Sequence, residues 1–153
     1  MDGLNQVGGM VQARLRHRTD PGDFIPVFLR LLTQNQINMN LCLVTRMERT
    51  DITCCVAETD GNRLENLMDS VTDFRGEGEF HGRVSLLSVF PHRSSLKTLG
   101  LALTALADAQ VPLYGFCSSL SAITFVIDQT QGKKAISSLS GSFEIPAAQV
   151  YSR

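Results

Sequence analysis

The stretch Thr19-Asp20-Pro21-Gly22-Asp23 carries residue types that could bind a small charged molecule. It precedes an apolar helical pattern, and backbone N–H groups at a helix N-terminus carry positive partial charge that attracts a carboxylate. Gly22 lets the backbone approach a ligand closely, and Asp20 or Asp23 could hold an ammonium group. A plain turn followed by a helix cap explains the same residues, and the sequence alone leaves that alternative open.

The remaining reactive side chains form no catalytic or metal-binding pattern. The three histidines, His17, His81 and His92, do not stand near a cysteine or carboxylate at metal-ligand spacing. Glu77 and Glu79 form a carboxylate pair, but they lie in a glycine-containing segment typical of a solvated loop. No nucleophile motif and no phosphate-binding glycine loop occurs. We therefore expect no enzyme activity, no metal and no cofactor.

The cysteines fit a reduced compartment. Cys42, Cys54, Cys55 and Cys117 lie in apolar strand patterns, and no Cys-x-x-Cys pair occurs. We expect all four to be small buried hydrophobic residues that form no disulfide.

The composition is that of a globular chain with one ordinary domain or two small ones. The 153 residues carry 15 acidic and 14 basic side chains, so there is no overall electrostatic case for nucleic acid or an anionic membrane. No run reaches the roughly 18 apolar residues of a membrane-spanning helix. The N-terminus lacks the basic and apolar regions of a signal peptide. These observations predict a cytoplasmic protein.

Hydrophobic periodicity predicts the same order of strands and helices in the first and second halves of the sequence. The first half is expected to hold a strand over 11–16, a helix after Asp23, strands over 37–46 and 51–59, a helix around 64–71 and a short strand around 79–81. Asp23 is preferred as the N-cap because Pro26 then falls in the first turn, where no hydrogen bond is lost. The second half is expected to hold a strand over 83–90, a helix over 96–109, an extended run opening at 110, a strand over 122–128, a helix over 131–143 and a strand over 144–151. Residues 1–9 are expected to be loose.

The two halves also match residue by residue, which indicates an internal duplication. The matched positions are Gln36 with Gln110 after the first helix of each half, Leu15 with Val89, Leu29 with Leu103, Leu32 with Leu106, and Ile52-Thr53 with Ile123-Thr124 in the closing strands.

Two βαββαβ units follow from this order, an α+β fold of the ferredoxin-like type in tandem. We place the units at 10–81 and 82–153, each an antiparallel sheet with two helices on one face. The helix over 96–109 is apolar on nearly all sides, which predicts burial on more than one side and close packing at Gly100. Because a monomer would expose that surface, we expect a homodimer.

Several motifs resemble, in order, the regulatory region of aspartate kinases, which is a pair of ACT domains. They are Asp20-Pro21-Gly22 before the first helix, Gln36-Ile37-Asn38-Met39 at a strand start, Thr50-Asp51-Ile52-Thr53 followed by Asp60-Gly61, and Gly82-Arg83-Val84-Ser85-Leu86 at the start of the second half. The resemblance covers residues 11–151 and implies a tandem ACT fold. The catalytic kinase domain of that family is absent from this sequence.

The resemblance implies an effector site that joins the loop of Thr19, Asp20, Gly22 and Asp23 to the second strand of the partner unit. In this sequence that strand begins at Pro112, Leu113 and Tyr114, whose carbonyl groups could accept hydrogen bonds from an ammonium. The equivalent loop of the second half, Arg93-Ser94-Ser95, lacks the proline and glycine of the family's pattern, and Pro112 stands where an asparagine is usual. We expect that second loop to bind more weakly.

The function implied is an allosteric sensor that binds an amino acid and controls its own assembly or a partner, such as a biosynthetic enzyme. The alternative is a structural or interaction module that keeps the fold but has lost the effector site. RNA binding is a rival from another class, because ferredoxin-like sheets bind RNA through exposed aromatic residues. Tyr114, Phe116 and Phe125 lack the basic residues of that motif nearby, so we expect neither a nucleic-acid nor a membrane partner.

Overall fold

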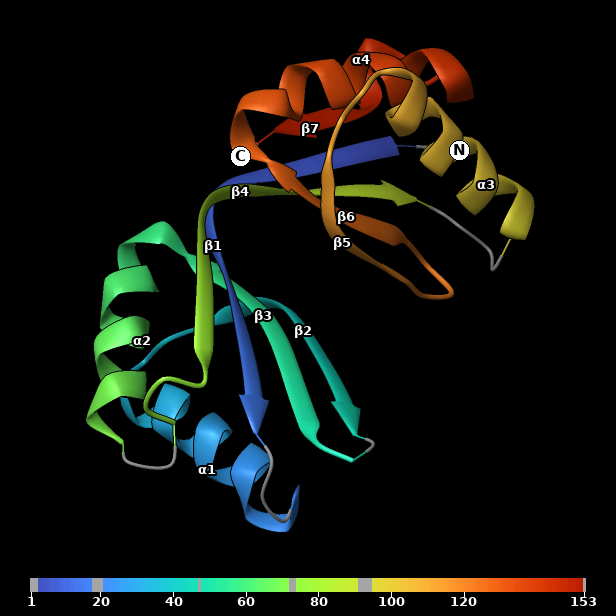
Figure 1. The fold of residues 1–153 in the computed structure, drawn as a ribbon. Helices are drawn as coiled ribbons and strands as arrows, with labels where there is room; N and C mark the ends of the chain where they lie inside the picture. Colours follow the sequence, from blue (N-terminus) through green and yellow to red (C-terminus); the bar gives the residue numbers. More distant parts are fainter. Residues whose placement is uncertain (1–2, 18–20, 47, 72–73, 91–94, 153) are drawn as a thin grey trace. The chain divides into compact units, whose positions relative to one another are not determined.

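The structure is a computed structural model that describes residues 3–17, 21–46, 48–71, 74–90 and 95–152 (Figure 1). The chain divides into two compact units. Met10–Gly82 form one, called the inserted unit below. Met1–Gly9 and Arg83–Arg153 form the other, called the split unit. Among the described residues, no helix is long and apolar enough to cross a membrane.

The inserted unit is a four-stranded sheet with two helices. Its elements are β1 (Gly3–His17, from Met10 onward), α1 (Pro21–Gln34), β2 (Met39–Arg46), β3 (Thr50–Ala57), α2 (Glu58–Ser70) and β4 (Gly78–Phe90, as far as Gly82). The strands lie in the order β2-β3-β1-β4, and β3 pairs antiparallel with both β1 and β2. This is the predicted βαββαβ order.

The core of the inserted unit lies between the helices and one face of its sheet. Alternating strand residues point to the same face, so β1 and β3 present apolar side chains to the helices. The core residues include Ala13, Leu15, Ile52, Cys54 and Val56 from the strands, Phe24, Phe28 and Leu32 from α1, and Leu64 and Met68 from α2. Phe74 closes this core, with its ring edge-on to Phe24 at a centroid distance of 5.0 Å.

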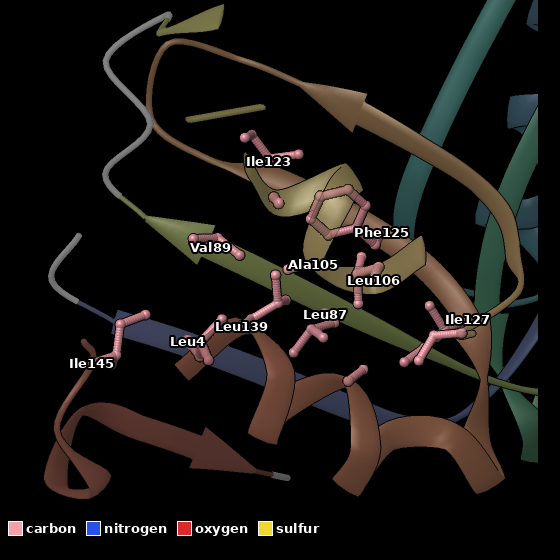
Figure 2. Packing of buried hydrophobic residues seen from close by; sticks show 13 residues of the cluster. Leu4, Leu87, Val89, Ala105, Leu106, Ile123, Phe125, Ile127, Leu139 and Ile145 are labelled. Atoms are coloured by element: carbon pink, nitrogen blue, oxygen red, sulfur yellow. The ribbon is translucent and has the colours of Figure 1, made fainter. Parts of the chain in front are cut away.

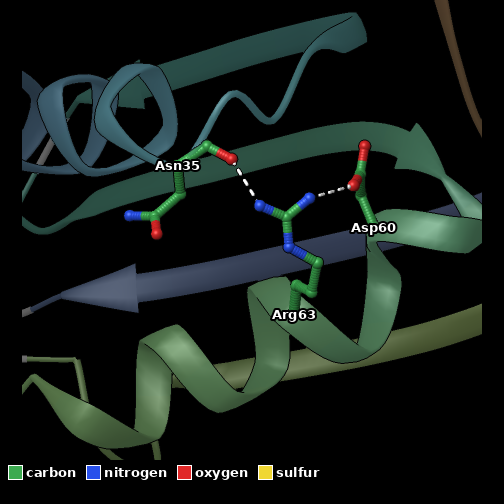
Figure 3. Close-up of polar contacts among 3 residues, drawn as sticks. All are labelled: Asn35, Asp60 and Arg63. Carbon is green, nitrogen blue, oxygen red and sulfur yellow. Dashed lines mark hydrogen bonds and ion pairs between the residues drawn. The ribbon is translucent and has the colours of Figure 1, made fainter.

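Arg63 joins the end of α1 to the start of α2 (Figure 3). One guanidinium nitrogen donates to the backbone carbonyl oxygen of Asn35 at 2.6 Å, and the other donates to Oδ1 of Asp60 at 2.9 Å. Because carbonyl groups at a helix C-terminus lack intrahelical donors, Arg63 supplies a partner that α1 itself cannot.

The split unit has the same architecture. After β4 it contains α3 (Leu96–Asp108), β5 (Leu113–Ser118), β6 (Ile123–Asp128), the 3₁₀ turn η1 (Gln129–Gln131), α4 (Gly132–Phe143), the 3₁₀ turn η2 (Ala147–Gln149) and β7 (Val150–Ser152). Its strands lie in the order β7-β1-β4-β6-β5. Figure 2 shows its core, where Leu4 of β1 packs among Leu87, Leu139 and Ile145.

The internal duplication extends to the ends of the first helix in each unit. Gln36 and Gln110 both adopt left-handed backbone conformations, with φ of 54° and 51°. The residue after each donates its backbone N–H to a carbonyl five residues back, Ile37 to Leu32 at 3.0 Å and Val111 to Leu106 at 2.9 Å. These bonds form a Schellman motif at the same place in both units. The glutamine matches in the sequence therefore mark equivalent helix ends.

Three strand predictions were wrong. Residues 3–9 are not loose but belong to β1, where the buried side chain of Leu4 and a parallel pairing with β7 hold them. The two strands predicted around 79–81 and 83–90 are one strand, β4, which continues through Arg83 although that residue takes a left-handed conformation (φ 56°). The last strand is only Val150–Ser152, since η2 occupies much of its predicted range.

The predicted packing around α3 and Cys42 was also partly wrong. Cys42 is exposed because β2 is an edge strand, whereas Cys54 and Cys55 are buried and Cys117 is half-buried; all four are free thiols. Within this chain α3 is buried on one side only, with Leu96 82% and Leu101 44% exposed. A Cβ atom added at Gly100 would meet open space, so no described residue of this chain explains that glycine by close packing.

Candidate effector sites

The predicted first loop leads into α1, which begins earlier than expected. The helix starts at Pro21, so Gly22 and Asp23 lie in its first turn and Asp23 is not the N-cap. Proline suits the first helical position because its missing N–H would have no partner there, and this start leaves Pro26 inside the helix with one hydrogen bond fewer. Thr19 and Asp20 lie outside the described residues. The backbone N–H groups in the first turn of a helix have no intrahelical partner, so they suit a ligand carboxylate wherever the helix begins.

Thr50 adds a polar group at the same end of the sheet. It pairs with His17, the last residue of β1, and so lies where the chain leaves the sheet for α1. Its side chain shares the helix-covered face with Ile52 and is fully buried. Among the described residues, its hydroxyl oxygen has no hydrogen-bond partner. A buried hydroxyl without a partner costs free energy, which marks this position as one where a further polar group would be favourable. The sequence could have pointed to this residue, because Thr50 is the first threonine of the Thr-Asp-Ile-Thr motif.

Of the predicted strand residues, Leu113 and Tyr114 open β5 in the split unit, and Pro112 directly precedes it. Pro112 and Tyr114 are exposed, and Leu113 is half-buried. The pairing with β6 shifts between Leu113 and Gly115, so Tyr114 forms a β-bulge on an edge strand. Bulges disrupt the hydrogen-bond ladder and are frequent beside binding sites. The backbone at Tyr114 therefore departs from the regular ladder between β5 and β6.

The inserted unit has the same bulge, which the sequence reasoning did not find. The pairing of β2 with β3 shifts between Met39 and Leu41, which places Asn40 where Tyr114 stands in the split unit. The offset that relates Gln36 to Gln110 also relates Asn40 to Tyr114, and it was the signal that could have identified this residue. Asn40 is exposed on the edge strand β2.

Tyr114 also contacts a second polar group within the split unit. Its hydroxyl donates to Oδ2 of Asp128 over 3.5 Å. Asp128 caps η1 by accepting hydrogen bonds from the hydroxyl and the backbone N–H of Thr130. These bonds, with a smaller contribution from Tyr114, hold the pKa of Asp128 below its ordinary value. Asp128 therefore stays ionised at neutral pH and offers a negative charge beside Tyr114.

The second loop is used as a helix cap. Ser95 is the N-cap of α3, and its hydroxyl accepts a hydrogen bond from the backbone N–H of Thr98 at 3.2 Å. This bond satisfies one of the donors that a ligand carboxylate would need. Arg93 and Ser94 lie outside the described residues. Within the part of the chain that the structure describes, no three His, Cys, Asp or Glu side chains gather as a metal site would require.

Comparison with solved structures identifies the fold. The regulatory subunit of aspartate kinase from Thermus flavus superimposes with a TM-score of 0.82 at 14% identity, over 92% of this chain and 97% of that one. Aspartate kinase from Synechocystis matches with a TM-score of 0.80 at 20% identity, over 94% of this chain and 27% of that one. Aspartokinase III from E. coli, in complex with lysine and aspartate, matches with a TM-score of 0.67 at 14% identity, over 90% of this chain and 32% of that one.

No protein-family model matches the sequence, and no curated protein matches it. At these identities the structural likeness shows the fold alone. The chain has the tandem ACT fold that the regulatory subunit of aspartate kinase also has, as the sequence motifs predicted.

Proposed function

We propose that this chain is a regulatory protein, not an enzyme, that binds a free amino acid and controls a partner enzyme or its own assembly. The observation that carries the proposal is the fold, which is shared with aspartate kinase regulatory subunits along 92% of the chain. The partner in this proposal is a biosynthetic enzyme of the cytoplasm. Lysine is the first amino acid to test, because the similar E. coli aspartokinase III was solved in complex with it.

The proposed effector site uses the first turn of α1. Backbone N–H groups around Gly22 would hold the ligand carboxylate, and Asp20 or Asp23 would hold its ammonium. Thr19 would add a hydroxyl. The hydroxyl of Thr50 is buried near the same end of the sheet and has no partner among the residues with a described placement, so we include it in the site.

The start of β5 is proposed as an ammonium-binding segment of the split unit. Pro112, Leu113 and Tyr114 would accept the ammonium through carbonyl groups, and the bulge at Tyr114 supports this role because it interrupts the ladder there. The loop of Arg93, Ser94 and Ser95 would bind more weakly, since Ser95 already caps α3 with its own hydroxyl.

Homodimer formation is part of the proposal. Leu96 and Leu101 expose apolar surface along α3, and Gly100 between them has open space above it. A second copy packed on this helix would bury that surface and use the close approach that a glycine permits. Light scattering at tens of micromolar should give a dimer, and Leu101→Lys should give a monomer. A wild-type monomer would contradict this part of the proposal.

The function is tested by heat denaturation with each of the twenty amino acids. One of them should stabilise the protein by about 2.7 kcal/mol at a hundredfold excess over its dissociation constant. Gly22→Val should remove the part of this stabilisation that comes from the first loop, because the added side chain fills the approach to the helix N-terminus. Ser95→Val is the matched control in the other unit and should leave most of it.

The alternative interaction module makes the opposite prediction. If no amino acid shifts the melting curve at millimolar concentration, or if Gly22→Val and Ser95→Val behave alike, the effector site has decayed. The chain would then act through its exposed surfaces alone.

A further inference from the structure

The inserted unit contains a charged cavity of about 300 Å³, called the charged pocket below. Arg16 at the end of β1, Arg49 before β3, Gly76 and Glu77 in the turn before β4, and Glu79 at the start of β4 line it. This volume is at the lower end of the range for small-molecule sites. The described residues that line it come from three separate places in the sequence.

The charged pocket lies on the opposite side of the sheet from Thr50. Arg16 pairs with Asp51 across β1 and β3, and neighbouring strand residues point to opposite faces, so Arg16 and Asp51 lie on the face away from the helices. Leu15 and Thr50 lie on the helix-covered face. The charged pocket is therefore separate from the proposed site at the start of α1.

Within the described part of the chain, the charges that line the cavity are two guanidinium groups and two carboxylates. Arg16 is held between Asp51, at 3.9 Å, and Glu79, at 3.7 Å. Among the described residues, no ion pair or hydrogen bond engages the side chains of Arg49 and Glu77. The guanidinium group of Arg49 and the carboxylate of Glu77 are therefore both available to a ligand in the charged pocket.

The backbone that presents Glu77 is fixed before any ligand arrives. Its N–H donates to the carbonyl of Phe74 at 3.1 Å, and its carbonyl accepts from the N–H of Arg16 at 3.1 Å. Phe74 is buried against Phe24. Gly76 takes φ +76°, a conformation that glycine adopts without strain. A site held in place by its surroundings loses less free energy on binding than a mobile one.

We propose that the charged pocket binds a free zwitterionic amino acid, with Arg49 on its carboxylate and Glu77 on its ammonium. The equal numbers of opposite charges favour a zwitterion: a simple anion such as phosphate would face two carboxylates, and a divalent cation would face two guanidinium groups. The inference extends the proposed function by a second site for the same class of ligand. It depends on none of the residues of the first site.

Heteronuclear NMR of the full chain tests the proposal, with lysine and then the other amino acids added singly to about 10 mM. Saturable shifts are expected at the backbone amides of Arg49, Gly76 and Glu77. Arg49→Gln and Glu77→Gln should each weaken binding at these amides about tenfold, because each removes one charge-assisted hydrogen bond. Arg30→Gln and Glu65→Gln make the same charge changes at exposed positions of the same unit and should leave the affinity unchanged.

The result separates the two sites. If Gly22→Val abolishes the shifts at Gly76 while Arg49→Gln does not, the charged pocket is not a site and the first-loop proposal stands. If Arg49→Gln weakens the shifts and Gly22→Val has no effect on any binding, the charged pocket is confirmed and the first-loop proposal falls.

Three other outcomes overturn the inference. One is the absence of shifts at these amides with all twenty amino acids. Another is an equal response to inorganic phosphate, strengthened by Glu77→Gln, which would show an anion site. The third is a response that the Arg30→Gln control loses as completely as Arg49→Gln.

Discussion

Replacing Thr50 with valine should stabilise the protein in the absence of ligand. The Thr50 side chain is fully buried, and no group in the part of the chain that the structure describes forms a hydrogen bond with its hydroxyl oxygen. Valine has nearly the same shape and replaces the hydroxyl with a methyl group that has no hydrogen bonds to lose. The substitution therefore removes an unfavourable group and leaves the packing against the core of the inserted unit in place.

The size of the effect follows from the cost of burying an unpaired hydroxyl. That cost is about 1–3 kcal/mol, and the added methyl contributes roughly 0.8 kcal/mol of apolar burial. Side-chain crowding by the methyl group offsets part of this gain. We expect the free energy of unfolding to rise by about 1–2 kcal/mol, which shifts the melting temperature upward by several degrees in a chain of this size.

Thr124→Val is the matched control in the split unit. Its hydroxyl lies 2.8 Å from the hydroxyl of Ser88 on the neighbouring strand, so the same substitution breaks a hydrogen bond and leaves Ser88 without its partner. Thr124→Val should lower the free energy of unfolding by about 1 kcal/mol. Urea denaturation of both variants and of the wild type, at one protein concentration, measures the two changes with opposite signs.

A fall in stability for Thr50→Val would refute the reasoning. It would mean that a partner, such as a bound water, satisfies this hydroxyl in solution. Thr50→Val could also stabilise the ligand-free protein and reduce the stabilisation that the amino acid gives. That pair of results would show that the Thr50 hydroxyl contributes to binding and lowers the stability of the free fold.

Three further predictions concern single side chains. Arg63→Ala should lower the free energy of unfolding by about 1 kcal/mol in urea denaturation, because the end of α1 loses its donor; no change would mean that water replaces it fully. Hydrogen bonds from Thr130 hold the pKa of Asp128 below its unfolded value of about 4, so its contribution to stability is present above that pH and is lost as the pH falls through the folded pKa. Thr130→Val should raise the pKa of Asp128 in an NMR titration, and an unchanged pKa would contradict the cause given. Iodoacetamide should label exposed Cys42 before Cys54, whose pKa burial raises to about 12; mass spectrometry of the folded protein that found Cys54 labelled first would contradict the structure.

The sequence was sufficient for the fold because its strongest signals are local and repeated. The change of hydrophobic period from two to 3.6 predicted each helix, and the Gln36 and Gln110 matches proved to be equivalent helix ends with the same backbone bonds. Element boundaries were less accurate. Pro21 began α1 ahead of the chosen N-cap, and polar residues of 3–9 gave no sign that β1 would be completed by pairing with β7.

The candidate sites depend on features that sequence patterns do not carry. Nothing in the sequence shows that the hydroxyl of Thr50 is buried without a partner, since this depends on the side chains packed around it. The bulges at Asn40 and Tyr114 arise from the pairing register, and the charged pocket from segments distant in sequence. Glu77 and Glu79 were noticed as a pair, but their arginine neighbours come from other parts of the chain.

Isothermal titration calorimetry of the purified chain with free amino acids tests the central claim most directly. We predict saturable binding of one amino acid with a dissociation constant between micromolar and millimolar, which corresponds to about 8 to 4 kcal/mol. Gly22→Val should abolish binding at the first loop, and Ser95→Val should not. The absence of binding heat for all twenty amino acids over several temperatures at millimolar concentration would contradict the claim that this tandem ACT chain is an amino-acid sensor.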